Sequence, residues 1–181
     1  MRTPVYAFLA IILTFSTLPA HADWATSSGS CYAKGDIHLS AGLTLSRLGG
    51  YAMFDIAVHD AISVGGGAGY YSYSYSRYWR YAYLPMTARV LFHPFNLSVL
   101  EDKIKIRDQF DLYVGLATGW RLGWAKQRNL STVINSQSSI GGFMLRENLG
   151  IRYFPSDNFY LFAETGAGFG WMSGGIGFRI N

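Results

Sequence analysis

Charged residues are scarce in this chain. Only 14% of its 181 residues are Asp, Glu, Lys or Arg, against about a quarter in an ordinary soluble domain. The excess of four positive charges is too small for a nucleic-acid-binding protein, which concentrates basic residues in a stripe. Apolar residues make up 50% of the chain and aromatic residues 17%, with 21 glycines. This composition excludes an intrinsically disordered chain.

Cysteine is almost absent. The single residue, Cys31, excludes a disulfide framework within the chain and a four-cysteine zinc site. It lies far from the apolar N-terminal run and lacks the small and leucine neighbours of a lipid-attachment site. We therefore expect Cys31 to be an inert thiol.

The one long apolar run lies at the N-terminus. Arg2 provides a positive charge, residues 5–13 are apolar throughout, and Ala20-His21-Ala22 is a small-x-small cleavage site. This order predicts a secretory signal peptide over residues 1–22, cleaved before Asp23. The rival interpretation is a membrane anchor, which needs about 18 apolar residues or more, and the run does not reach that length.

From Gly35 onward, apolar and polar residues alternate with a period of two. In the clearest segment, 110–124, the even-numbered positions are mostly apolar, whereas the odd-numbered ones are glycine, small, polar or charged. Such alternation is typical of β-strands. We expect eight strands, at residues 36–46, 51–58, 61–75, 80–93, 110–124, 141–154, 158–168 and 172–180.

The alternation alone does not say which face points outward. A soluble barrel of the lipocalin kind would bury the apolar face, whereas a membrane barrel turns it toward lipid. The polar face is rich in small residues, as a narrow lumen requires, and its charges are arginines and acids without lysine. Aromatic residues near the strand ends also resemble interfacial girdles: Tyr70, Tyr71, Tyr73, Tyr81, Trp120, Trp124, Tyr153, Phe154, Phe159, Tyr160 and Trp171. We therefore favour the membrane barrel.

These patterns predict an all-β fold, an eight-stranded antiparallel transmembrane β-barrel with short periplasmic turns. Closure of the sheet allows every backbone group to be paired within lipid. Residues 1–22 are the expected signal peptide, 23–34 an N-terminal periplasmic segment and 35–181 the outer-membrane barrel. The expected periplasmic turns are 59–60, 94–108 and 155–157, and the expected outer loops are 47–50, 75–80, 125–140 and 169–171.

Three features fit the alternation less simply. Pro85 cannot donate to a strand ladder, so it requires a bulge or an unpaired position. Glu147 falls on the apolar face, and either it lies beyond the hydrocarbon or a bulge resets the alternation before it. Residues 94–108 are long for a turn and form either a short amphipathic helix or an extended connection.

The strand pattern resembles the small bacterial outer-membrane β-barrel proteins, the group of the OmpA transmembrane domain and OmpX. The resemblance covers residues 35 to 181 and rests on segments 111–116, 150–153 and 163–166 and on the closing hairpin strand 174–180. It implies a barrel architecture without indicating an activity. The chain ends in Ile180-Asn181, where members of that group usually end in an aromatic residue that the insertion machinery reads.

Charged residues on the polar face would face the lumen. They are Asp55, Arg89, Asp111, Arg121, Arg146, Arg152, Glu164 and Arg179. Because unpaired buried charge is costly, we expect these residues to pair. A structural network that seals the barrel is favoured over a gated ion path, since side chains fill the interior of an eight-stranded barrel.

Histidines do not indicate a metal site or a catalytic site. His38, His59 and His93 map near the periplasmic rim, where no two have a tight ligand spacing, and we favour rim histidines that face water. Hydrolysis or acyl transfer needs a nucleophile, a base and an orienting acid. Serines are plentiful on the predicted outer side, but histidines are not, so we expect neither catalysis nor a cofactor.

The segment from Tyr70 to Tyr83 has the most unusual composition. It alternates tyrosine with serine, which are residues of adaptable binding surfaces. One interpretation is an outer-loop binding surface that comprises Tyr73, Arg77, Trp79 and Arg80. An extended aromatic girdle is the interpretation we favour.

Together these features favour a structural or membrane-integrity role without catalysis. A surface adhesin or ligand-binding barrel and a narrow ion or solute conduit are the alternatives. The expected partners are outer-membrane lipid and lipopolysaccharide, which basic outer residues can meet, and the barrel-insertion machinery during assembly. No nucleic-acid partner is expected.

Overall fold

The computed structural model describes residues 31–45, 47–75, 79–97, 105–127 and 137–180. The predicted signal peptide lies outside these residues, as does most of the predicted segment 23–34. In chain order the elements are β1 (Ile37–Thr44), β2 (Leu48–His59), β3 (Ile62–Ser74), β4 (Trp79–Phe92), the 3-10 turns η1 (Pro94–Asn96) and η3 (Lys105–Asp108), β5 (Phe110–Gln127), β6 (Gln137–Ser139), β7 (Gly142–Ser156), β8 (Phe159–Gly166) and β9 (Gly170–Ile180).

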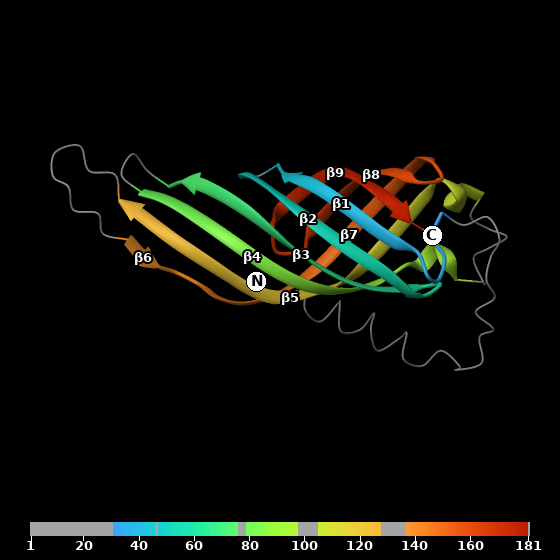
Figure 1. Ribbon diagram of the computed structural model, residues 1–181, viewed down its shortest axis with the longest axis horizontal. Coiled ribbons are helices and arrows are strands. Elements are labelled where there is room, and N and C mark those ends of the chain that lie inside the picture. The colour runs from blue at the N-terminus through green and yellow to red at the C-terminus, as the bar shows by residue number, and fades with distance from the viewer. Residues whose placement is uncertain (1–30, 46, 76–78, 98–104, 128–136, 181) are drawn as a thin grey trace, which may run out of the picture.

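The strands form one closed antiparallel barrel (Figure 1). The sheet closes because β1 pairs with β9 and β4 pairs with β5. β6 and β7 lie along the same edge of β5, so β6 is a short continuation of one wall strand. The predicted fold class, an eight-stranded antiparallel barrel, is confirmed.

The register around the barrel sets the stagger of the strands. A path across paired residues from Phe110 on β5, through β7, β8, β9, β1, β2, β3 and β4, returns to β5 at Trp120. The return point is ten residues beyond the start. For eight strands this stagger corresponds to a strand tilt of roughly 45°. Residues far apart in the sequence therefore reach the same level of the lumen.

The apolar face points outward all around the barrel. Leu43 on β1 is 66% exposed and Phe143 on β7 is 67% exposed, whereas lumen-facing His38 and Asp55 are fully buried. A soluble barrel with its apolar face inside is therefore the wrong alternative. None of the helices in the described part of the chain is long and apolar enough to cross a membrane.

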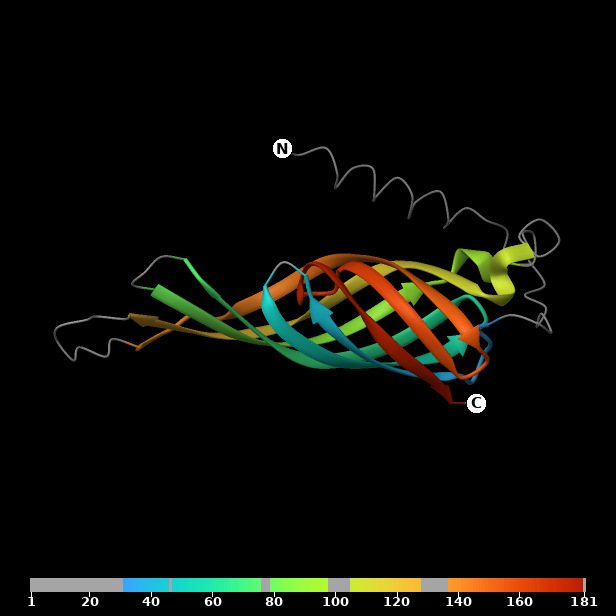
Figure 2. The same ribbon diagram turned by 90° about the horizontal axis from the view of Figure 1, so that it is seen from above.

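The strands are uneven in length, and this makes the two ends of the barrel different. We call the end where Ile37 pairs with Ile180 the terminal end, and η1 and η3 lie there (Figure 2). At the opposite end, which we call the loop end, β3, β4, β5 and β6 extend past the other strands and form a projecting wall (Figure 1). β5 has 18 residues, whereas β1 and β8 have 8 each.

The boundaries of all four predicted outer loops need correction at the loop end. Residues 48–50 belong to β2, 79–80 to β4, 125–127 to β5 and 170–171 to β9, so these parts of the predicted loops 47–50, 75–80, 125–140 and 169–171 are strands. Residues 137–139 form β6. At the terminal end the predicted insert 94–108 contains η1 and η3, and its residues 98–104 lie outside the described part.

The two residues that fitted the alternation poorly have different explanations. Pro85 pairs with Arg121 on β5 but lies in an interruption of the β3–β4 ladder, so it is unpaired on the side that faces β3, as one of the two expectations required. Glu147 pairs with Leu116 in an uninterrupted register between β5 and β7. The bulge proposed to reset the alternation is therefore wrong, and Glu147 lies on the outward face.

The predicted aromatic girdle is only partly correct. Tyr70 and Trp120 are exposed on the outside of the barrel, and Trp171 is exposed at the register shift between β8 and β9. Tyr71, Phe154 and Tyr160 are buried, and their places in the alternation direct them to the lumen. The aromatic residues of this chain therefore serve two purposes, because some line the outer surface and others fill the interior.

Candidate functional site

The middle of the lumen holds a buried charge network centred on Arg89 of β4. Its Nε and Nη2 donate to the two carboxylate oxygens of Asp55 at 2.7 and 2.6 Å, and its Nη1 donates to Glu164 at 2.9 Å. The side chains of all three residues are at most 2% exposed. Charges removed from water in this way must be paired, and these three come from β4, β2 and β8.

A second arginine extends the network toward the terminal end. Arg152 on β7 donates from Nη2 to Asp55 at 2.6 Å and from Nη1 to Asp111 at 3.4 Å. Glu164 also accepts hydrogen bonds from the hydroxyls of Tyr51 and Tyr113, at 2.7 and 2.9 Å. Two cations and three carboxylates thus link β2, β4, β5, β7 and β8 across the lumen.

The network continues into a Ser-His-Asp arrangement. The Nδ1 atom of His93 lies 2.8 Å from Oδ1 of Asp111, and its Nε2 atom lies 2.9 Å from Oγ of Ser63. Serine hydrolases use the same order of groups. Here the serine and the imidazole are fully buried, and the ring of Tyr32 stacks on His93 with 3.9 Å between centroids. The arrangement therefore has no room for a substrate next to the serine.

The prediction that His38 and His93 face water is wrong. Both are fully buried in the lumen, because their places in the alternation direct them inward. His38 lies against an aromatic layer, with its ring 5.5 Å from Tyr32 and 5.7 Å from Tyr160 between centroids. Among the described residues, no group of three or more His, Cys, Asp or Glu side chains could hold a metal ion.

The segment before β1 closes the terminal end. Tyr32 enters the lumen, while the backbone N–H of Lys34 donates to Asp60 at 3.0 Å and that of Gly35 donates to Ala57 O at 2.8 Å. Cys31 is buried beside Tyr32. Burial raises the pKa of the Cys31 thiol and of the Tyr32 phenol far above their ordinary values. Neither group ionises near neutral pH, which is what an apolar plug requires.

The connection between β8 and β9 closes the lumen from the other side of the network. Gly166, Ala167 and Gly168 all have positive φ, at 83°, 50° and 86°. This left-handed turn directs Phe169 into the lumen, where it is fully buried and stacks on Tyr51 with 4.3 Å between ring centroids. From the loop end to the terminal end, the lumen is thus filled first by Phe169 and Tyr51, then by the charge network, and then by the aromatic layer around Tyr32 and Tyr160.

Five of the eight predicted lumen charges form this network: Asp55, Arg89, Asp111, Arg152 and Glu164. Arg179 instead lies 3.8 Å from Asp36 at the terminal end. Arg121 and Arg146 face the loop end, and neither forms an ion pair with a carboxylate of the described residues. The alternation placed all eight residues on the inner face of the barrel, but it did not show how far along the barrel axis each of them lies.

Sequence reasoning missed Tyr32, Ser63 and His93 as parts of the lumen filling. The alternation of β3 and β4 already directs Ser63 and His93 inward, and a count of inward residues at the terminal end could have found both. No sequence signal indicated Tyr32, because it precedes the first strand.

The predicted outer-loop residues divide between the two faces of the projecting wall. Tyr73 and Trp79 lie on its inner face, with Tyr81 stacked on Tyr73 at 5.4 Å between centroids. Arg80 lies on the outer face, where it pairs with Lys126 across the strands and donates to Ser72 Oγ at 3.4 Å. Arg77 lies outside the described residues.

Comparison with known proteins identifies the fold. No family model matches the chain, and no curated protein matches it. The N-terminal barrel domain of Pseudomonas aeruginosa OprF is 16% identical, with a TM-score of 0.52 over 81% of this chain and 98% of that one. Yersinia pestis Ail, the attachment invasion locus protein, solved with the heparin analogue sucrose octasulfate, is 17% identical, with a TM-score of 0.51 over 81% and 99%.

A third solved structure gives the same result. The outer membrane protein OprG from Pseudomonas aeruginosa is 11% identical to the chain, with a TM-score of 0.54 over 83% of this chain and 98% of that one. These likenesses confirm the barrel architecture that the strand pattern implied. The chain shares its fold with small eight-stranded barrels of bacterial outer membranes.

Proposed function

We propose that this protein is an outer-membrane barrel with a structural, membrane-integrity role and no catalysis. The observation that carries the proposal is the filled lumen, in which Arg89, Arg152 and their three carboxylates hold five strands together. The outward apolar face supports insertion into lipid. Residues 1–22 would direct export, and the barrel-insertion machinery would receive the chain in the periplasm.

In this proposal the terminal end faces the periplasm and the loop end faces the exterior. The first strand begins and the last strand ends at the terminal end, where Ile37 pairs with Ile180, and this is the side from which an exported chain inserts. The long strands of the projecting wall then stand above the outer leaflet. This orientation fits the usual outer-membrane arrangement of short turns inside and longer segments outside.

A conduit is disfavoured by the side chains that fill the lumen. Phe169 and Tyr51, the charge network and Tyr32 lie in sequence along it, and each of these layers consists of buried side chains. In a planar lipid bilayer the wild-type protein should add no ion current above the baseline. A steady current whose ion selectivity changes in the Glu164→Gln variant would favour a conduit instead.

Catalysis is disfavoured by the burial of the only serine–histidine–aspartate contact among the described residues. Tyr32 covers His93, and Ser63 is fully buried. The rate of ester hydrolysis, measured with cells and with the purified barrel, should be the same for the Ser63→Ala variant as for the wild type. A wild-type esterase activity that this variant loses would contradict the non-catalytic role.

The structural role predicts an envelope defect on deletion. Cells without the protein should become more permeable to detergents and large antibiotics. The wild-type gene should restore the barrier, and so should a Tyr73→Ala, Trp79→Ala, Arg80→Ala triple variant. Failure of the triple variant, while it is still folded in the outer membrane, would move the function to the projecting wall.

Surface binding is the second candidate function, and the projecting wall favours it. Its outer face carries the adjacent cations Arg80 and Lys126, and its inner face carries stacked tyrosines. The structurally similar Ail was solved with a heparin analogue, and a sulfated glycan would suit this cation pair. Binding of sucrose octasulfate to the wild-type barrel, lost in an Arg80→Gln, Lys126→Gln variant that still folds, would support this function.

A further inference from the structure

The wall of the barrel has a lateral gap near its loop end. β7 begins at Gly142, but its ladder with β8 begins only at Asn148, opposite Gly166. Along residues 142–147, β7 therefore pairs on one side only, with β5. Alternate residues of an antiparallel strand point their N–H and C=O groups to opposite sides, so part of this backbone faces the gap without a strand partner.

A cavity of about 530 Å³ occupies this gap. Its lining includes Phe143 and Met144, and also Arg146 and Glu147. Neighbouring residues of a strand point to opposite faces of the sheet. A cavity that borders neighbouring residues of β7 therefore lies along the edge of this strand, where the lumen is open toward the side.

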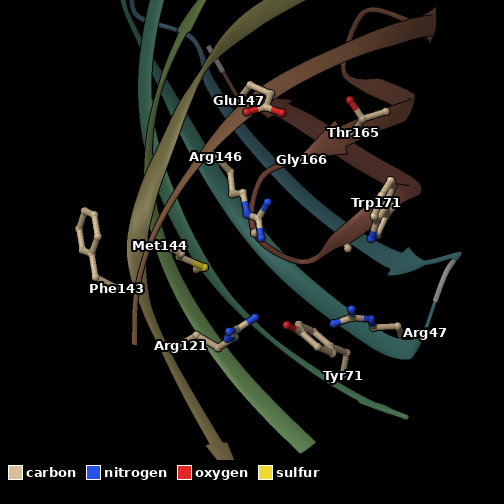
Figure 3. A pocket seen from close by; sticks show the side chains of 12 residues that line it. Arg47, Tyr71, Arg121, Phe143, Met144, Arg146, Glu147, Thr165, Gly166 and Trp171 are labelled. Atoms are coloured by element: carbon tan, nitrogen blue, oxygen red, sulfur yellow. The ribbon is translucent and has the colours of Figure 1, made fainter. Parts of the chain in front are cut away.

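The inner side of the cavity is strongly cationic. Arg146 extends from β7 toward the space bordered by Arg121 and Arg47, whereas Phe143 points away from it (Figure 3). Arg47 lies over Tyr71 with its Cζ 5.0 Å from the ring centroid. None of the ion pairs within the described residues involves any of these three arginines. The buried Nε of Arg121 also has no hydrogen-bond partner there, and a buried donor of this kind needs one.

The outward face of β7 beside the cavity carries Phe143, which is 67% exposed, and on β9 Trp171, which also borders the cavity, is 81% exposed. Glu147 lies on this outer side at the level of Leu116, which is nearer the terminal end than the exposed Trp120. The gap thus opens within the apolar band of the barrel. Lipid-exposed strand edges with unmet backbone groups do not occur in hydrocarbon, so a polar group must occupy the opening.

We propose that this gap binds the phosphorylated sugar head group of an outer-leaflet glycolipid, which enters from the side. A phosphate would reach Arg121 and Arg146, whose planar guanidinium groups match phosphate oxygens. Sugar hydroxyls would satisfy the free backbone edge of β7 and Glu147. The acyl chains would remain outside, against Phe143 on the outward face of β7. The inference relies on the proposed location, because only there does the gap face the outer leaflet.

The ligand must combine charge with an apolar part. A soluble anion would use the arginines and leave the outward-facing Phe143 exposed, whereas a neutral lipid would leave the three guanidinium groups without a counter-charge. A phosphorylated glycolipid satisfies both sides of the cavity at once.

Native mass spectrometry of the folded barrel in detergent tests this inference. The probes are lipid A with two phosphates, the same lipid after enzymatic removal of the phosphates, and inorganic phosphate. The variants are Arg121→Gln, Arg146→Gln and the double variant, with Lys34→Gln as a control that removes one exposed positive charge at the terminal end, away from the cavity. The difference between unboiled and boiled gel bands establishes that each variant is folded. Because Arg146 is exposed, its single variant remains informative even where the double variant does not fold.

The expected result is a one-to-one lipid A adduct of the wild-type and Lys34→Gln proteins. Its affinity should fall about tenfold for each arginine removed and also on removal of the phosphates. Equal binding by the Arg146→Gln and wild-type proteins would overturn the proposal. Equal binding of inorganic phosphate would overturn the lipid assignment and leave a soluble-anion site. Failure of the proposed location is distinguishable, because it would appear as absence of the protein from outer-membrane fractions whether or not lipid A binds.

Discussion

Replacement of Asp55 by Asn is the perturbation that tests the lumen network most directly. The carboxylate accepts two hydrogen bonds from Arg89 and one from Arg152, all between 2.6 and 2.7 Å. Without it, Arg152 retains only Asp111 at 3.4 Å among its carboxylate partners in the described residues. Loss of one partner from a buried ion pair costs about 3–5 kcal/mol. The Asp55→Asn variant should lose that much unfolding free energy, which is roughly two to four orders of magnitude in the folded-to-unfolded ratio.

The assay is urea unfolding of the barrel in detergent micelles, followed by the loss of the compact unboiled band on a gel. Asp157→Asn is the matched control, because Asp157 is exposed in the turn between β7 and β8. An added Arg89→Gln substitution should cost less in the Asp55→Asn background than in the wild type, because the two groups are in contact. A stability of the Asp55→Asn variant within about 0.5 kcal/mol of the control, the range of ordinary surface changes, would refute the reasoning.

Three further predictions concern the filling of the lumen. A Cβ at Gly150 would lie 2.3 Å from the tyrosine ring across the strand pair, whereas one at Gly142 would have no heavy atom within 4 Å. Gly150→Ala should therefore lose about 1–3 kcal/mol in urea unfolding, and equal effects of the two substitutions would contradict the packing. Because burial raises the pKa of the Cys31 thiol, maleimide should label it only after boiling in SDS, while a cysteine at exposed Ser156 should react in the folded barrel. Rapid labelling of folded Cys31 would show that the terminal end is open. Phe169→Ala removes a fully buried ring and should cost about 3–5 kcal/mol, and a change below about 1 kcal/mol would place that ring outside the lumen.

The sequence predicted which side of the barrel wall each strand residue faces, but it did not predict how far along the barrel axis each residue lies. Alternation identified Asp55, Arg89 and Glu164 as members of one inner face, because the period of a strand is two residues. Their contacts depend on the ten-residue stagger around the barrel, which brings β2, β4 and β8 to one level. No local pattern encodes that stagger. For the same reason Arg121 and Arg146 could not be separated in advance from the central network.

Two features of the lumen filling lay outside any strand pattern. Tyr32 precedes β1, and its position depends on the hydrogen bonds of Lys34 and Gly35 to β2 and to the turn between β2 and β3. Phe169 enters the lumen through a turn in which Ala167, which is not glycine, has a positive φ. A φ of this sign is uncommon outside glycine, and composition alone does not predict it. Sequence reasoning therefore located the wall of the barrel better than the groups that close it.

The central claim is that the apolar face contacts lipid in the outer membrane. The most direct measurement is the gel mobility of the protein in a purified outer-membrane fraction, compared before and after boiling in SDS. The protein should be present in that fraction and run as a distinct compact band that shifts only on heating. Release of the protein with the periplasmic contents, without a heat-dependent shift, would contradict the claim.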